Sequence, residues 1–156
     1  MTYSIRGLSP ETFAPLFALD DAALAAIKAR RVTATADRGF PCRISLDDAK
    51  AGEELILLHH TSHDVETPYR SAYAIYVRPG AQAATYRDEL PPVFEGRPLA
   101  LRAFDAEGML HTARLAGPGE ADSAIRDLFA DTGISYIDAH NAAHGCFAAR
   151  IERDAA

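Results

Sequence analysis

The short connections between apolar segments limit the fold of this chain more than any other feature. From residue 31 onward, short apolar or alternating segments follow one another with few residues between most of them. A parallel crossover needs about a dozen or more residues, whereas a hairpin closes in roughly two to five. A mainly antiparallel sheet is therefore predicted. One connection, residues 79–96, is much longer and is predicted to form a lid or to cover a sheet edge.

Two kinds of pattern predict the strands. Alternation of apolar and polar side chains, typical of a half-buried strand, predicts strands at 32–36 and 42–46. The nearly continuous apolar run 54–60 is typical of a central strand covered on both faces. Gly108 lies near the end of a short turn between two apolar segments, a pattern typical of a hairpin. Further strands are predicted at 71–78, 99–104, 109–115, 134–139 and 146–152.

Helices are predicted near the N-terminus and late in the chain. Ser9 and Pro10 are typical of a helix start, and Pro15 keeps this helix short because proline removes a hydrogen-bond donor. An aspartate at 20–21 caps a second helix. Apolar residues at helical spacing in 120–131 predict a third. The chain is therefore assigned to the α+β class, as a mainly antiparallel sheet with N-terminal helices and one later helix packed on it.

Composition and charge exclude several classes of protein. The 156 residues fit a single domain, 1–156, that can bury a core without a disulfide or metal. The net charge of −6 argues against a nucleic-acid partner, which requires clustered Lys and Arg. No apolar run approaches the ~20 residues of a membrane span and no signal peptide is visible, so a cytoplasmic protein with free thiols is expected. Nucleotide-binding and serine hydrolase motifs are missing from the sequence, and no cofactor is expected.

The last predicted turn gathers residues capable of covalent chemistry. Cys146 is the candidate nucleophile and His140 the candidate base of an enzyme. The alternative is an inert thiol, because unpaired cysteine is usually buried, and this interpretation is favoured for Cys42 on its apolar face. Cys42, His140, His144 and Cys146 would form a metal set if their segments met. Their spacing fits no compact zinc pattern, so no metal is predicted.

Arginine and tyrosine side chains suggest an anion site. Arg43 and Arg70 can each bind a carboxylate or phosphate through two nitrogens, and Tyr69 adds a donor. With His60 and Asn141 they form the predicted ligand-binding set. The alternative is that Arg43 only pairs with a nearby structural carboxylate, which would look identical in the sequence.

A second polar cluster, residues 59–64, lies at a strand end. Because side chains alternate along a strand, only one of His59 and His60 can face a given side. Asp64 could orient a neighbouring imidazole as a base. The alternative, which is favoured, is a solvated loop.

The chain resembles a known family, the bacterial DUF1203 proteins, a domain family of unknown function. The resemblance runs nearly end to end. It implies no activity, so no catalytic role carries over. It is carried by Pro41-Cys42-Arg43, Ser45-Leu46, Asp48-Ala49, Gly52-Glu53, Pro68-Tyr69-Arg70, Tyr76-Val77, Arg97-Pro98-Leu99, Gly145-Cys146 and Arg153.

Three hypotheses remain open at this stage. The first is a domain that binds a small polar or anionic ligand between the segment around Arg43 and the C-terminal hairpin. The second is an enzyme that uses Cys146 or His140. The third is an interaction module, a homodimer formed through an exposed strand edge.

Overall fold

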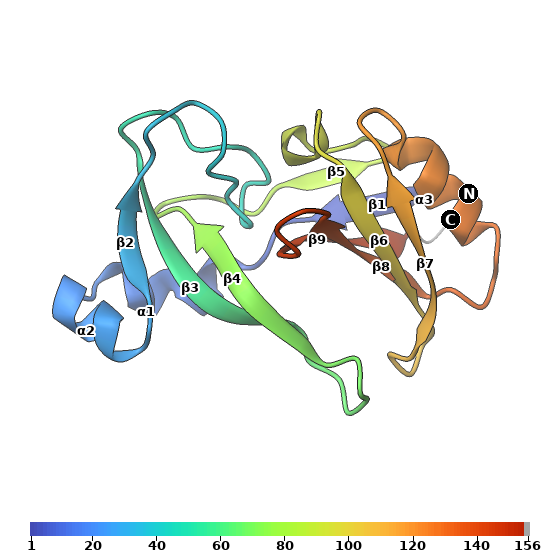
Figure 1. The fold of residues 1–156 in the computed structure, drawn as a ribbon, viewed down its shortest axis with the longest axis horizontal. Coiled ribbons are helices and arrows are strands. Elements are labelled where there is room, and N and C mark those ends of the chain that lie inside the picture. Colours follow the sequence, from blue (N-terminus) through green and yellow to red (C-terminus); the bar gives the residue numbers. More distant parts are fainter. Residues whose placement is uncertain (155–156) are drawn as a thin grey trace.

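The strands of the computed structural model, which describes residues 1–154, form two antiparallel sheets (Figure 1). The six-stranded sheet has the order β5-β1-β9-β8-β6-β7, and the three-stranded sheet has the order β2-β3-β4. The predicted α+β class and antiparallel pairing are confirmed, but the division into two sheets was not foreseen. The strands are β1 Tyr3–Arg6, β2 Arg30–Thr33, β3 Glu54–His63, β4 Ser71–Val77, β5 Thr85–Arg87, β6 Leu99–Phe104, β7 Leu110–Ala116, β8 Tyr136–Asn141 and β9 Phe147–Arg153.

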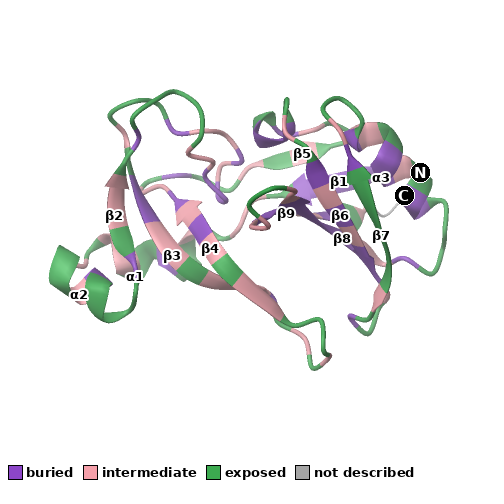
Figure 2. Cartoon of the chain, viewed as in Figure 1, coloured by how far each residue is buried: buried purple, intermediate pink, exposed green. Residues whose placement is uncertain are grey.

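The six-stranded sheet carries the larger core. Helix α3, Ala121–Phe129, packs on one face of it, as its predicted apolar stripe requires. Figure 2 shows buried residues on α3 and on strands of this sheet such as β6 and β9. The side chains of this core include Tyr3, Ile5, Leu99, Leu101, Ile125, Leu128, Phe129, Ile137 and Ile151.

The three-stranded sheet has its own smaller core. Helices α1, Pro10–Phe17, and α2, Asp21–Ala26, cover it, and both begin where predicted. Asp20 caps α2, since its carboxylate accepts a hydrogen bond from the Ala23 amide at 2.8 Å. This core includes Phe13, Leu24, Cys42, Ile44, Ile56, Ile75 and Val77. No helix within residues 1–154 is long and apolar enough to cross a membrane.

Several strands differ from the predicted ones. β1 and β5 were not predicted, and β5 lies within the long 79–96 connection, where it forms an edge of the six-stranded sheet. The same connection holds a short 3-10 helix, Pro92–Phe94. The predicted 32–36 strand ends at Thr33. β3 is central as predicted, but most of its side chains stay partly exposed, so it is not covered on both faces.

The predicted strand at 42–46 is wrong, because this segment turns instead of extending. Leu46 has a positive φ of 57°, and its amide donates to the Cys42 carbonyl at 3.0 Å. The Arg43 amide donates to the Tyr76 carbonyl of β4 at 3.0 Å. On the other side, a Cβ at Gly7 would lie 1.7 Å from the Ile44 carbonyl oxygen, so only glycine fits there. The segment is therefore wedged between the two sheets.

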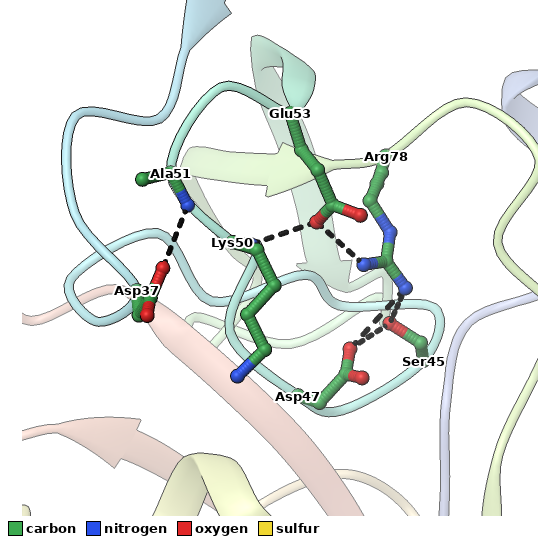
Figure 3. Close-up of polar contacts among 7 residues, drawn as sticks. All are labelled: Asp37, Ser45, Asp47, Lys50, Ala51, Glu53 and Arg78. Atoms are coloured by element: carbon green, nitrogen blue, oxygen red, sulfur yellow. Dashed lines mark hydrogen bonds and ion pairs between the residues drawn. The ribbon is translucent and has the colours of Figure 1, made fainter.

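Arg78, just after β4, holds the loop that contains this segment (Figure 3). Its guanidinium donates to Glu53 at 2.9 Å and lies 3.5 Å from a carboxylate oxygen of Asp47. The same guanidinium reaches the Ser45 hydroxyl at 3.4 Å. These contacts tie the end of the turn to the loop that leads into β3. They give the cavity beside it a preformed wall.

Candidate ligand-binding cavity

A cavity of about 440 Å³ lies between the three-stranded sheet and the turn that joins β8 to β9. The turn stands opposite β4 in Figure 1. The volume falls within the usual range of small-molecule sites. The lining residues are Gly39, Pro41, Arg43, Leu57, Tyr73, Ala74, Tyr76, Arg97, Pro98, Asn141, Ala142, Ala143, His144 and Cys146.

Arg43 forms the charged wall of the cavity. Its side chain is only 3% exposed, and its Nε donates to the Phe147 carbonyl at 2.8 Å. Its Nη1 donates to the Pro41 carbonyl at 2.6 Å. The Nη2 has no nitrogen or oxygen partner within residues 1–154. Since every fully buried side-chain nitrogen or oxygen there has one, Nη2 is not fully buried, and the Cys146 side chain lies within hydrogen-bonding reach of the guanidinium.

The guanidinium of Arg43 has no counter-charge among the described residues. Its titratable neighbours are the thiol groups of Cys146 and Cys42 and another arginine, Arg97. Burial lowers the pKa of Arg43, and the adjacent sulfur of Cys146 acts in the opposite direction. A buried cation without a carboxylate is costly. An anion in the cavity would remove this cost.

The β8–β9 turn brings Asn141 and Cys146 to the cavity, with Cys146 next to Arg43. The Asn141 amide donates to the Cys146 carbonyl at 2.9 Å, and Gly145 closes the turn with a φ of 78°. The Asn141 side chain donates through Nδ2 to Sγ of Cys146 at 3.3 Å. The Ala142 amide donates to the Pro98 carbonyl at 3.0 Å, which ties the turn to the start of β6.

The lining is positively charged, although the protein carries a net charge of −6. It includes Arg43 and Arg97 but, within the described residues, no Asp or Glu. Arg97 is neutralised from behind, because Asp48 accepts from both of its terminal nitrogens at 3.1 and 2.8 Å. The charge left for a ligand is therefore that of Arg43.

Three residues of the predicted ligand set lie outside the lining. His60 packs its ring against Phe13 of α1, with centroids 5.5 Å apart, and burial lowers its pKa. Tyr69 and Arg70 lie just before β4, whereas Arg43 meets Tyr76 near its other end. Seven strand residues span roughly 20 Å. Arg70 instead pairs with Asp64 at 2.9 Å on the surface.

The predicted catalytic pair is divided between two faces. Cys146 is partly exposed and lines the cavity, whereas His140 is 3% exposed and lies outside the lining. The Nδ1 of His140 is 3.0 Å from the Gly145 carbonyl, and its ring packs edge-on against Phe147. Asn141 follows His140 along β8, and neighbouring strand residues point to opposite faces.

The predicted metal alternative is not assembled. Cys42 is fully buried in the smaller core, as its apolar neighbours indicated, and does not line the cavity. Within residues 1–154, no three His, Cys, Asp or Glu side chains lie close enough to hold a metal ion. The cavity brings only His144 and Cys146 of the proposed metal set together.

A second buried polar cluster lies between the sheets, outside the cavity lining. The predicted solvated loop around His63 is wrong: this side chain is 0% exposed and sits 2.7 Å from the Tyr136 hydroxyl. Arg150 of β9 donates to both oxygens of Asp138 at 2.7 and 2.9 Å. Its guanidinium also lies over the Tyr136 ring. In this cluster the charge of Arg150 is balanced by that of Asp138.

Sequence analysis missed part of the cavity lining. Arg97 was quoted for the family resemblance but given no role, and Tyr73, Tyr76 and Leu57 were assigned only to strands. The pairing of Leu57 with Tyr76 follows from the β3–β4 register, which the loop length alone did not determine. The acidic neighbour of Arg97 lies 49 positions away, so no local pattern marks it.

Comparison with known proteins gives one match. The model of the family described as "Protein of unknown function (DUF1203)" matches residues 39–153. The match begins after β2, so it is shorter than the nearly end-to-end resemblance that the sequence indicated. It includes the segment around Arg43 and the β8–β9 turn. No curated protein and no solved structure matches the chain.

Proposed function

Because this chain belongs to the DUF1203 family, whose description assigns no activity, we propose a function from the cavity itself. The protein binds a small organic anion, with the anionic group on Arg43 and an apolar body against the rest of the lining. The observation that carries this proposal is the buried guanidinium of Arg43. It lacks a carboxylate partner among residues 1–154, and one of its nitrogens is not fully buried.

Charge supports the anionic end of the ligand. Asp48 already neutralises Arg97, so Arg43 is the cation with charge to offer. Asn141 and His144 add polar groups on the facing turn. An arginine in a low-dielectric site gains far more from an anion than one in water. The polar groups of the lining are few and convergent, which is typical of small-molecule sites.

The apolar lining supports the rest of the ligand. Pro41, Leu57, Ala74 and Pro98 surround the cavity together with the rings of two tyrosines. Such walls favour a hydrocarbon or aromatic body over a free inorganic ion. A monocarboxylate with an aromatic or short aliphatic body satisfies both ends, and a phosphate ester of similar size is the comparison compound.

A thermal-shift screen with and without Arg43 tests the proposal. Small aromatic and aliphatic carboxylates should stabilise the protein, with inorganic phosphate and neutral amides of the same acids as comparison compounds. At a concentration about 100-fold above Kd, binding adds about 2.7 kcal/mol to the free energy of unfolding. In a domain of this size, this raises Tm by roughly 5–10 °C. Arg43→Met should abolish the shift.

Two further variants make the test decisive. Arg70→Met removes an exposed arginine outside the cavity and should leave the shift unchanged. Ala142→Phe fills the cavity from the turn and should abolish the shift without touching a charge. If carboxylates and their neutral amides stabilise equally, or if Arg43→Met and Ala142→Phe both retain the shift, the proposal is wrong.

A further inference from the structure

Cys146 places a thiol in the cavity that anion binding does not require. Its side chain is partly exposed, whereas the other cysteine, Cys42, is completely buried. Its sulfur accepts a hydrogen bond from Nδ2 of Asn141 at 3.3 Å. The sulfur therefore faces the cavity with one donor already directed at it.

Arg43 supplies a second, independent feature beside this sulfur. The arginine is more than nine-tenths buried, it neighbours Cys146, and no carboxylate within residues 1–154 offsets its charge. The thiolate is the reactive form of cysteine, and an adjacent cation favours it. A buried guanidinium with an open nitrogen is also placed to stabilise a negative oxygen that forms next to the sulfur.

We propose that Cys146 is a site of oxidation by organic hydroperoxides that enter the cavity. The sulfur attacks the terminal, hydrogen-bearing oxygen of the hydroperoxide, so that a sulfur–oxygen bond forms and the oxygen–oxygen bond breaks. Sulfur loses two electrons and the peroxide gains them. The departing alkoxide takes the proton that left the thiol. The products are a sulfenic acid at Cys146 and one alcohol.

The surroundings select the oxidant and the product. The mostly apolar lining, with Leu57 and Pro98, favours an organic hydroperoxide over hydrogen peroxide. Cys42 is fully buried in the smaller core and lies outside the lining, so a hydroperoxide in the cavity meets Cys146 and not Cys42. We expect the oxidised protein to carry one extra oxygen atom and no internal disulfide.

The test is a time course of oxidation with cumene hydroperoxide and with hydrogen peroxide. Intact-protein mass follows the reaction, and trapping with dimedone followed by peptide mass analysis locates the sulfenic acid. We expect Cys146 to be the residue modified, with cumene hydroperoxide faster than hydrogen peroxide. Arg43→Met should slow the reaction about tenfold or more, because the lost charge acts at close range in a low-dielectric site. Arg43→Lys, which keeps the charge, should slow it less.

Two variants keep the test decisive if Arg43→Met does not fold. Ala142→Phe should slow cumene hydroperoxide more than hydrogen peroxide, because it narrows the cavity without removing a polar group. Cys42→Ser should leave the rate unchanged. The proposal is overturned if Cys146 reacts no faster than free cysteine, if Ala142→Phe leaves both rates unchanged, or if a Cys42–Cys146 disulfide is the product.

This inference shares its cavity with the proposed function but depends on the sulfur. A bound carboxylate should protect Cys146 in the wild type. If the wild type shows the thermal shift but Cys146 is unreactive, only the oxidation site fails. If oxidation depends on Arg43 but no carboxylate binds, only the proposed function fails.

Discussion

Two arginines lie where the sheets meet, and they differ in how their charge is balanced. Arg150 donates to both oxygens of Asp138, a fully buried carboxylate. Arg43 donates to two backbone carbonyls and meets no carboxylate within residues 1–154. Burial opposes the charge of both. The hydrogen bonds and charge of Asp138 outweigh it and raise the pKa of Arg150, whereas burial prevails and lowers the pKa of Arg43.

This difference separates a structural pair from an incomplete one. The charges of Arg150 and Asp138 neutralise each other within the protein. Arg43 is a buried cation without a counter-charge among the described residues, and it lies at the wall of a cavity. A buried arginine indicates a ligand only when its counter-charge is missing, so the partner of the arginine is more informative than the arginine itself.

The largest expected effect comes from a variant that breaks the ion pair of Arg150 and Asp138. Arg150→Met leaves the carboxylate of Asp138 buried without a cation, which should lower the free energy of unfolding by about 3 kcal/mol. Arg43→Met loses two hydrogen bonds but also removes an unpaired buried charge, so its loss should be about 1 kcal/mol. Urea unfolding of the two variants measures the difference. Equal losses would mean that the two arginines do not differ as described.

A smaller effect is expected from a variant that gives Arg43 a counter-charge within the protein. Asn141→Asp is nearly isosteric and places a carboxylate in the same cavity lining as Arg43. It should raise the free energy of unfolding by about 1 kcal/mol through this added counter-charge. It should also abolish the carboxylate-induced thermal shift, because the internal anion occupies the cation. Unchanged stability together with retained binding would contradict the assignment of Arg43 as the open charge.

The smallest effect concerns the histidine on the far face of the same turn. Burial lowers the pKa of His140, with the cation of Arg102 adding to it, although the Gly145 carbonyl acts in the opposite direction. The unfolded chain therefore takes up a proton more readily than the folded one. The stability from neutral His140 is fully present above about pH 6.5 and is lost as pH falls below it.

Urea midpoints measured from about pH 8 to pH 5 check this behaviour. His140→Gln should flatten the decline that the wild type shows as pH falls. His144→Gln, at an exposed position on the same turn, is the matched control and should keep the wild-type slope. A wild type whose stability rises towards pH 5 would contradict the predicted direction.

The fold was predictable where local patterns carry the information. The Gly108 hairpin, the final hairpin and the α3 stripe each depend on residues close in the chain, and all three formed. β1 and β5 are short, with four and three residues, and each is stabilised by partners far along the sequence. Such strands leave too few residues for a period to be visible.

The local structure around Arg43 was predicted wrongly for one physical reason. Alternation at 42–46 resembled a strand, but Cys42, Arg43 and Ile44 are all buried because the segment is enclosed on several sides. A two-faced pattern cannot describe such surroundings. The convergence of Arg43 with Asn141 and Cys146 was nevertheless foreseen, because charged and reactive residues near turns are frequent at functional sites.

The pairing of β1 with β9 has a consequence for biosynthesis. Residues 3–6 emerge from the ribosome well before residues 147–153, which form one of their two neighbours in the sheet. Contacts of such high sequence separation slow folding, and one edge of β1 stays unpaired until β9 has been translated. The turn that closes the cavity is translated just before β9. The candidate cavity is thus completed together with the sheet.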